Sequence, residues 1–157
     1  MKQELENKLY KRFPRFFEWR RPRQYKNKLL SWFSMVRHRF YWDALYQQGL
    51  KLSFVVLDDH KGYIPLECGD GWFDLIYTMC LDIETIDPPV IFWFEQVKEK
   101  FASLRVYTSF YNKEIEDVID VASLKSSITC EKCGKEGSLV INFGWYSTKC
   151  EECNEKS

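Results

Sequence analysis

The chain has 157 residues, of which 45% are hydrophobic and 17% aromatic. This composition is ample for one compact core and argues against a globally disordered chain. The formal net charge is zero, yet residues 1–42 hold twelve of the 23 basic and only three of the 23 acidic residues. Two explanations fit this asymmetry: the basic segment faces an acidic body within one fold, or it binds a polyanion such as nucleic acid.

The first residues carry no targeting signal. MKQELENKLYKRFPRFF has neither the apolar stretch nor the small-residue cleavage site of a signal peptide, and no run of 18 apolar residues occurs. We therefore expect a cytoplasmic protein without a membrane span. Cys68 and Cys80, together with four cysteines at metal-binding spacing, fit a reducing compartment better than a disulfide framework.

Residues 1–49 are expected to form a basic, aromatic, helical N-terminal region. Apolar residues recur at helical spacing from about residue 23 to residue 48, and Gly49 can end that helix. Arg37 and Arg39 lie between the apolar positions, so they would face solvent or an anionic partner. Residues 50–57 (LKLSFVVL) then predict a short strand.

Residues 50–127 are expected to form an α+β core. Within it, residues 67–74 read ECGDGWFD. Asp70 stands between two glycines, which predicts a tight turn with Asp70 as the cap of a helix that runs to about residue 84. Trp72 has two interpretations: it anchors the core, or it offers a stacking face beside the free N–H groups of the helix start.

A small antiparallel sheet packed against helices completes the expected core. Residues 90–97 (VIFWFEQV) predict its central strand, and residues 104–108 predict the neighbouring strand of a hairpin. Asn112 is expected to cap a second helix, over residues 112–125.

Four side chains of the predicted hairpin are candidates for anion binding. Strand alternation places Lys98 and Lys100 on one face of the first strand, and Arg105 and Tyr107 on one face of the second. Such a set suits a phosphate with an adjacent ring. A solvated sheet face is the simpler alternative.

Residues 128–157 are expected to form a zinc-ribbon-like module with a small hairpin around Gly144. Cys130 and Cys133 form one Cys-x-x-Cys pair, and Cys150 and Cys153 form a second after sixteen intervening residues. This spacing is typical of a structural Zn²⁺ site, whose four thiolates leave no position open for a catalytic water. The module holds nearly equal numbers of Lys and Glu, which favours a structural staple over a phosphate-binding finger.

Three segments resemble a family of small proteins of bacteriophages and prophages. They are ECGDGWFDLI (67–76), QVKEKFASLRVY (96–107), and IEDVIDVASLKSSITCEKCG with GWYSTKC (115–134 and 144–150). The family carries such a turn, such a hairpin, a helix and a C-terminal zinc module, in this order. Ala102 departs from the glycine that the family usually has. The family is largely without an assigned activity, so the resemblance implies a phage gene that acts in a bacterial cytoplasm.

We expect a binding protein rather than an enzyme, because His38 and His60 lack motif neighbours and no glycine-rich phosphate loop occurs. The favoured hypothesis is a phage accessory protein that sequesters a small anionic, nucleotide-type bacterial immune signal and so counteracts host defence. Its candidate ligand residues are Trp72, Lys98, Lys100, Arg105, Tyr107, Arg37 and Arg39. The alternatives are nucleic-acid binding through the basic N-terminal region and inhibition of a host protein. The sequence leaves the oligomeric state open, a homo-oligomer included.

Overall fold

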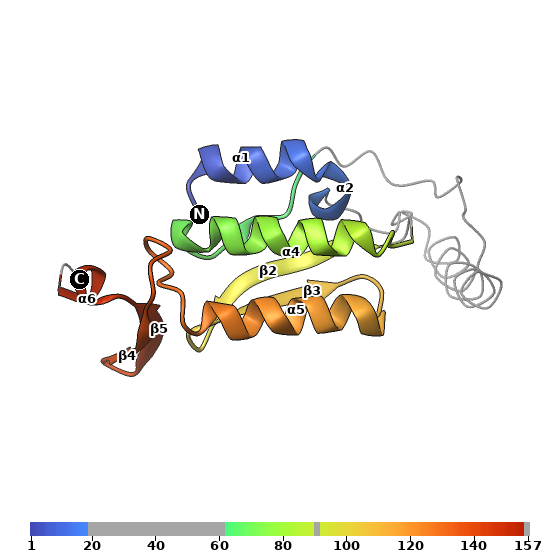
Figure 1. The fold of residues 1–157 in the computed structure, drawn as a ribbon. Coiled ribbons are helices and arrows are strands. Elements are labelled where there is room, and N and C mark those ends of the chain that lie inside the picture. Colours follow the sequence, from blue (N-terminus) through green and yellow to red (C-terminus); the bar gives the residue numbers. More distant parts are fainter. Residues whose placement is uncertain (19–61, 90–91, 156–157) are drawn as a thin grey trace, which may run out of the picture. The chain divides into compact units, whose positions relative to one another are not determined.

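The structure, a computed structural model, describes residues 1–18, 62–89 and 92–155 (Figure 1). The chain divides into two compact units, one made of residues 1–18 and 63–157 and the other of residues 19–62. Arg37 and Arg39 lie outside the described residues. So do the helix and the strand expected between residues 23 and 57, and the domain boundary expected after residue 49.

The first eighteen residues belong to the hydrophobic core. Helix α1 (Gln3–Arg12) is followed by the short α2 (Pro14–Phe17), in which proline suits the first position because that position needs no N–H donor. The buried side chains of this segment are Leu9, Tyr10, Phe13, Phe16 and Phe17. The Tyr10 hydroxyl donates to the Ile64 carbonyl oxygen at 2.8 Å, and Arg12 pairs with both carboxylate oxygens of Glu84 at 3.0 and 2.6 Å. These N-terminal aromatic rings therefore pack inside the fold.

The core sheet has three strands in the order β1–β2–β3. β1 (Leu66–Glu67) runs parallel to β2 (Phe94–Lys100), and β2 runs antiparallel to β3 (Ser103–Thr108). The central place of the apolar strand is confirmed, but its bounds differ from the expected 90–97. β2 begins at Phe94 and extends to Lys100, and residues 92 and 93 are not part of a strand. Residues 90 and 91 lie outside the described residues. The sheet is mixed rather than purely antiparallel, because a helix instead of a tight turn connects β1 with β2.

Two helices lie side by side against this sheet (Figure 1). They are α4 (Phe73–Thr85), which follows the short 3₁₀ helix η1 (Asp70–Trp72), and α5 (Lys113–Ser126). Their buried apolar side chains are Ile76, Met79, Cys80, Ile83, Ile115, Ile119 and Ala122. Each large apolar side chain among them contributes about 1.5–3 kcal/mol when it leaves water. The expected α+β arrangement is thus confirmed for the described residues.

The two predicted helix caps have different outcomes. The Asn112 side chain accepts a hydrogen bond from the Ile115 N–H at 3.1 Å, so this cap is confirmed. The Asp70 cap is wrong: the Asp70 carboxylate accepts from the backbone N–H of Lys2 at 2.6 Å and pairs with the Lys2 ammonium at 3.1 Å. Asp70 therefore fastens the N-terminal segment to the turn.

The C-terminal part consists of β4 (Ser138–Asn142), β5 (Trp145–Lys149) and α6 (Glu151–Glu155). The hairpin expected around Gly144 is confirmed. Phe143 and Gly144 both have positive φ, 49° and 82°, which is the conformation of a two-residue type I′ turn. Within the described residues, none of the helices has the length and apolar character required to cross a membrane.

Candidate metal centre and binding face

Four cysteines meet at the C-terminal end of the core. The Sγ atoms of Cys130, Cys133, Cys150 and Cys153 all lie within 4.8 Å of one another, and those of Cys133 and Cys150 are 3.5 Å apart. All four are thiols rather than disulfide-bonded, because a disulfide bond would require about 2.05 Å between two sulfur atoms. Sulfur atoms bound at about 2.3 Å to a tetrahedral ion stand about 3.8 Å from one another. The cluster can therefore coordinate a metal ion.

Backbone N–H groups converge on the first of these thiols. Burial raises the pKa of Cys130, but hydrogen bonds from the backbone N–H groups of Cys150, Cys133 and Lys132 outweigh it and lower the pKa to about 6. Hydrogen bonds with the side chains of Cys133 and Cys150 instead raise the pKa of Cys153 to about 12. Thiols this close share their protons, and a bound cation replaces those protons.

The first cysteine pair is seated on the ECGDGWFD turn. The Gly71 N–H donates to the Glu131 carbonyl oxygen at 2.8 Å. A Cβ atom at Gly71 would lie 2.2 Å from the Cys130 carbonyl oxygen, and one at Gly69 would lie 2.2 Å from the Glu131 carbonyl oxygen. Neither glycine has a positive φ. Both positions therefore require glycine because the backbone of the cysteine turn comes so close.

Trp72 is a core residue of the same contact. Its side chain is fully buried, and its indole N–H donates to the Thr129 carbonyl oxygen at 2.8 Å, just before the first cysteine. The buried ring has no face for a ligand, so Trp72 does not serve as the stacking residue considered from the sequence. The core-anchor interpretation agrees with its position.

We call residues 128–155, which carry the four cysteines, the cysteine module. This module contacts the core at a second point, the tip of the β2–β3 hairpin. The buried Thr148 hydroxyl of β5 donates to the Ala102 carbonyl oxygen at 2.8 Å. The Thr148 carbonyl oxygen accepts from the Glu131 N–H at 2.9 Å. Phe101 and Ala102 form that tip with φ of 53° and 62°, so this chain uses two non-glycine residues in the left-handed region. The module is thus fixed to both the turn and the sheet.

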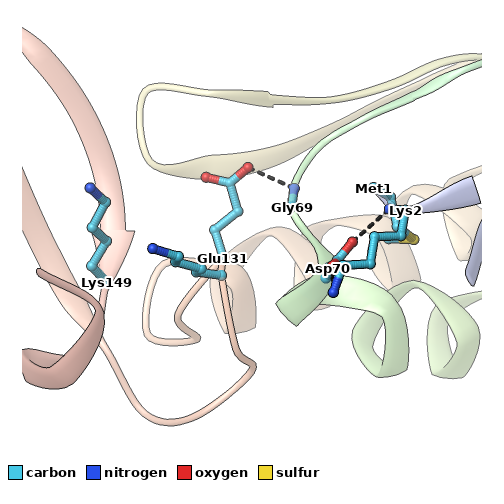
Figure 2. A pocket seen from close by; sticks show the side chains of 7 residues that line it. Met1, Lys2, Gly69, Asp70, Glu131 and Lys149 are labelled. Carbon is cyan, nitrogen blue, oxygen red and sulfur yellow. Dashed lines mark hydrogen bonds and ion pairs between the residues drawn. The ribbon is translucent and has the colours of Figure 1, made fainter. Parts of the chain in front are cut away.

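A cavity of about 390 Å³ lies beside the first cysteine pair (Figure 2). It is lined by Met1, Lys2, Gly69, Asp70, Glu131, Lys132 and Lys149. Figure 2 shows the Glu131 carboxylate turned toward Gly69, and it accepts a hydrogen bond from the Gly69 N–H at 2.8 Å. In the same view Lys2 lies beside Asp70. Burial raises the pKa of Glu131. Sequence reasoning missed this cluster because its members come from four separate segments of the chain.

The β2–β3 register brings the four predicted hairpin residues onto one face. Lys98 lies opposite Arg105, Gln96 lies opposite Tyr107, and Lys100 lies opposite Ser103. Val97 and Leu104, which point the other way, are buried in the core. We call the side chains of Lys98, Lys100, Arg105 and Tyr107 the basic face.

Electrostatics of the basic face favour an anion. The Lys98 ammonium lies 5.4 Å from the centre of the Tyr107 ring, and the Arg105 guanidinium donates to the Ser123 hydroxyl at 3.3 Å. Among the described residues, neither lysine has a carboxylate partner within salt-bridge distance. Glu67 lies opposite Lys98 on the adjacent strand, where it accepts a hydrogen bond from Gln96 at 3.0 Å. The face is thus net positive.

The structure adds two rings that sequence reasoning did not single out. Phe101 projects from the tip of the β2–β3 hairpin with its ring centre 5.5 Å from the Lys100 ammonium. Its ring is 5.9 Å from that of Tyr146 on β5, edge to face. The sequence signal that could have identified Phe101 is a large aromatic residue in a two-residue hairpin turn, where a side chain is usually exposed. Tyr146 could be assigned only from tertiary contacts.

The remaining thiols have structural positions. Burial raises the pKa of Cys68 to about 12, and it raises the pKa of the fully buried Cys80 as well. Such thiols are poor nucleophiles.

Comparison of the chain with known protein families, with curated proteins and with solved structures gives no match.

Proposed function

We propose that this protein binds an anion made of nucleotide units on its basic face. The observation that carries the proposal is the β2–β3 register, which gathers Lys98, Lys100, Arg105 and Tyr107 on the side of the sheet away from the core. A nucleotide offers the complementary groups, a phosphate for the cations and a flat base for the ring.

The energies of such contacts are sufficient for specific binding. A hydrogen bond to a charged group contributes about 1.5–3 kcal/mol, and stacking contributes roughly 1–3 kcal/mol per base. Arg105 can contact two phosphate oxygens at once with its planar guanidinium, whereas each lysine acts as a point charge. Binding of this kind requires no catalytic group, which is consistent with a binding protein rather than an enzyme.

The four-cysteine cluster is proposed to hold one structural Zn²⁺. Four sulfur ligands in tetrahedral reach suit zinc and leave no open coordination position. The ion would keep the first cysteine pair on the ECGDGWFD turn and so support the sheet that presents the basic face. We also propose that residues 128–157 form the zinc-ribbon-like module expected from the sequence.

The biological role that we propose is that of a phage accessory protein, acting in the bacterial host cytoplasm. The resemblance of three segments of the sequence to the phage and prophage family supports this setting. A nucleotide-type immune signal is then the small ligand whose sequestration would counteract host defence. A homo-oligomer is compatible with this role.

Inhibition of a host protein is the second candidate, because the β4–β5 hairpin exposes large apolar side chains. They are Leu139, Ile141, Phe143 and Trp145. Exposed apolar surface of this kind is a feature of protein-binding sites.

Calorimetry with mononucleotides, cyclic dinucleotides and short oligonucleotides tests the proposal. The wild type is compared with a variant that combines Lys98→Gln, Lys100→Gln and Arg105→Gln, and with the control Lys125→Gln, an exposed cation on α5. We expect binding by the wild type and the control, and at least about a hundredfold weaker binding by the triple variant. Equal binding by the triple variant, or no nucleotide binding by the wild type, would contradict the proposal. Copurification of a host protein with a non-binding wild type would favour the second candidate.

A further inference from the structure

We infer that the ligand of the basic face is single-stranded nucleic acid, whose bases stack on a row of rings that continues from the β2–β3 hairpin onto β5. This inference rests on the proposed binding of nucleotide units at the basic face, and it takes the ligand of that face to be a nucleic-acid strand in place of a small immune signal. The ring row consists of Tyr107, Phe101 and Tyr146.

Two of the three rings in this row each lie beside a lysine, and the third ring lies against the second. Lys98 lies over the Tyr107 ring at 5.4 Å, Lys100 lies over the Phe101 ring at 5.5 Å, and the Phe101 ring meets that of Tyr146 at 5.9 Å. Single-stranded nucleic acid offers the groups that such rings and cations bind, because each nucleotide carries one base and one phosphate. Proteins that bind single strands combine cations along the backbone path with aromatic side chains for the bases.

The rings of this row are accessible. The exposed fraction of the side chain is 45% for Tyr107, 68% for Phe101 and 44% for Tyr146. The aromatic residues of the core, such as Phe17 and Phe94, are by contrast fully buried. Tyr107 and Phe101 lie next to ammonium groups that have no carboxylate partner among the described residues, which favours a ligand that is both flat and anionic over an apolar protein surface.

The basic face is mostly exposed: Lys100, Arg105 and Tyr107 are exposed and Lys98 is half-buried. The cavity beside the cysteines and a second cavity of about 300 Å³ between α4 and α5 are both lined by other residues. Small ligands gain affinity by being mostly enclosed in a pocket, and neither of these two cavities is lined by a residue of the basic face. An extended strand instead gains affinity by repeating weak contacts along its length. The geometry therefore favours an oligonucleotide over a mononucleotide.

A single strand fits the ring row better than a duplex does. In a duplex each base is already stacked between its neighbours, so exposed side-chain rings find no free base face without unstacking the helix. Unpaired bases can splay out and stack on tyrosine and phenylalanine.

The three cations of the basic face predict a modest dependence of affinity on salt. For single strands each phosphate contact contributes about −0.7 to the slope of log affinity against log salt concentration, so three contacts give a slope of about −2.

Fluorescence anisotropy with labelled oligonucleotides provides the test. The probes are a 15-nucleotide oligothymidine, a three-nucleotide oligothymidine and a mixed-sequence 15-base-pair duplex, each titrated at several salt concentrations. We expect the 15-mer to bind at least about tenfold tighter than either other probe. Phe101→Leu and Tyr146→Leu keep an apolar side chain but remove the ring, so each should weaken 15-mer binding by about 5- to 150-fold, which corresponds to one lost base stack.

Trp145→Leu is the matched control. Trp145 is 80% exposed but lies opposite Asn142, whereas Tyr146 lies opposite Ile141, so the two aromatic rings project from opposite faces of the hairpin. Its replacement should change 15-mer affinity by less than about twofold. Circular dichroism and metal content confirm that each variant is folded.

Three results would overturn the inference. If the duplex bound as tightly as the single strand, stacking of unpaired bases on the rings could not explain the affinity. Equal affinity for the three-nucleotide and 15-nucleotide probes, weakened by the Lys98, Lys100 and Arg105 substitutions, would overturn the extended strand while leaving the proposed nucleotide function intact. Unchanged affinity of Phe101→Leu and Tyr146→Leu would exclude the ring row. Absence of binding to every nucleotide probe would instead contradict the proposed function itself.

Discussion

The two halves of the cysteine module differ in how the rest of the protein holds them. The turn with Cys130 and Cys133 is in contact with Gly69 and Gly71 at distances that allow no additional atom. The β4–β5 hairpin, which leads to Cys150, instead exposes the large apolar side chains of its turn and strands. Thr148 is the one fully buried residue of that hairpin. The metal site thus joins a half that is part of the core to a half that is mostly exposed.

This difference indicates what a metal ion bound by the four cysteines would do for the fold. A two-stranded hairpin is at best marginally stable by itself in water. The exposed half would therefore depend on the proposed metal ion and on Thr148, whereas the docked half contributes contacts of its own to the core. Loss of the metal should be felt in the core as well, because the first cysteine pair covers the turn from which α4 starts.

Removal of the metal is expected to have the largest effect. A strong chelator, or Cys150→Ser, should unfold the exposed half and lower the melting temperature of the described core unit by at least about 10 °C, because metal binding and local folding are coupled. Differential scanning calorimetry with elemental analysis measures both quantities. An unchanged core transition after complete metal loss would show that the module is an independent appendage.

Gly71→Ala tests the docked half directly. The new Cβ would lie 2.2 Å from the Cys130 carbonyl oxygen and 2.4 Å from the Gly134 nitrogen, and backbone atoms cannot move aside as a flexible side chain can. We expect a loss of about 3 kcal/mol or more in the free energy of unfolding, at or beyond the upper end for overpacked sites. Gly62→Ala is the control, since no atom lies within 4 Å of the position that its new Cβ would take. Chemical denaturation of both variants should therefore separate them clearly.

Thr148→Val tests the single buried anchor of the hairpin. Valine keeps the shape of threonine but cannot donate to the Ala102 carbonyl oxygen, which Thr148 contacts at 2.8 Å. A buried acceptor without its donor costs about 1–3 kcal/mol. Ser147→Ala, on the opposite face of the same strand, should cost less than about 0.5 kcal/mol. Equal effects in urea denaturation would mean that Thr148 is not the anchor.

Features set by local sequence could be predicted well. Asn112 caps α5 because its side chain needs only an N–H three residues later, and the Cys-x-x-Cys spacing brings two thiols together within one turn. Alternation along β2 and β3 likewise predicted which side chains share a face. Each of these features depends on residues that are close in the sequence, so it can be predicted from the local sequence pattern.

Features set by distant contacts could not be predicted in this way. Asp70 has the residue type and the flanking glycines of a cap, but Lys2, 68 positions away, takes its carboxylate. The glycines at 69 and 71 resemble ordinary turn residues, although their actual requirement is space for Glu131 and Cys130. The parallel pairing of β1 with β2 was equally invisible, because only two residues of β1 take part.

The smallest expected effect concerns the exposed turn of the β4–β5 hairpin. Phe143 is fully solvent-exposed and has a φ of 49°, which a bulky side chain adopts less readily than asparagine does. Phe143→Asn would give the Asn-Gly sequence preferred in type I′ turns, so we expect the free energy of unfolding to stay unchanged or to rise by about 0.5 kcal/mol. Trp145→Asn, which leaves the turn conformation alone, is the comparison in the same denaturation experiment. A loss above about 1 kcal/mol for Phe143→Asn would mean that the ring packs on another surface in solution, and the contrast between a docked and an exposed half of the module would no longer hold.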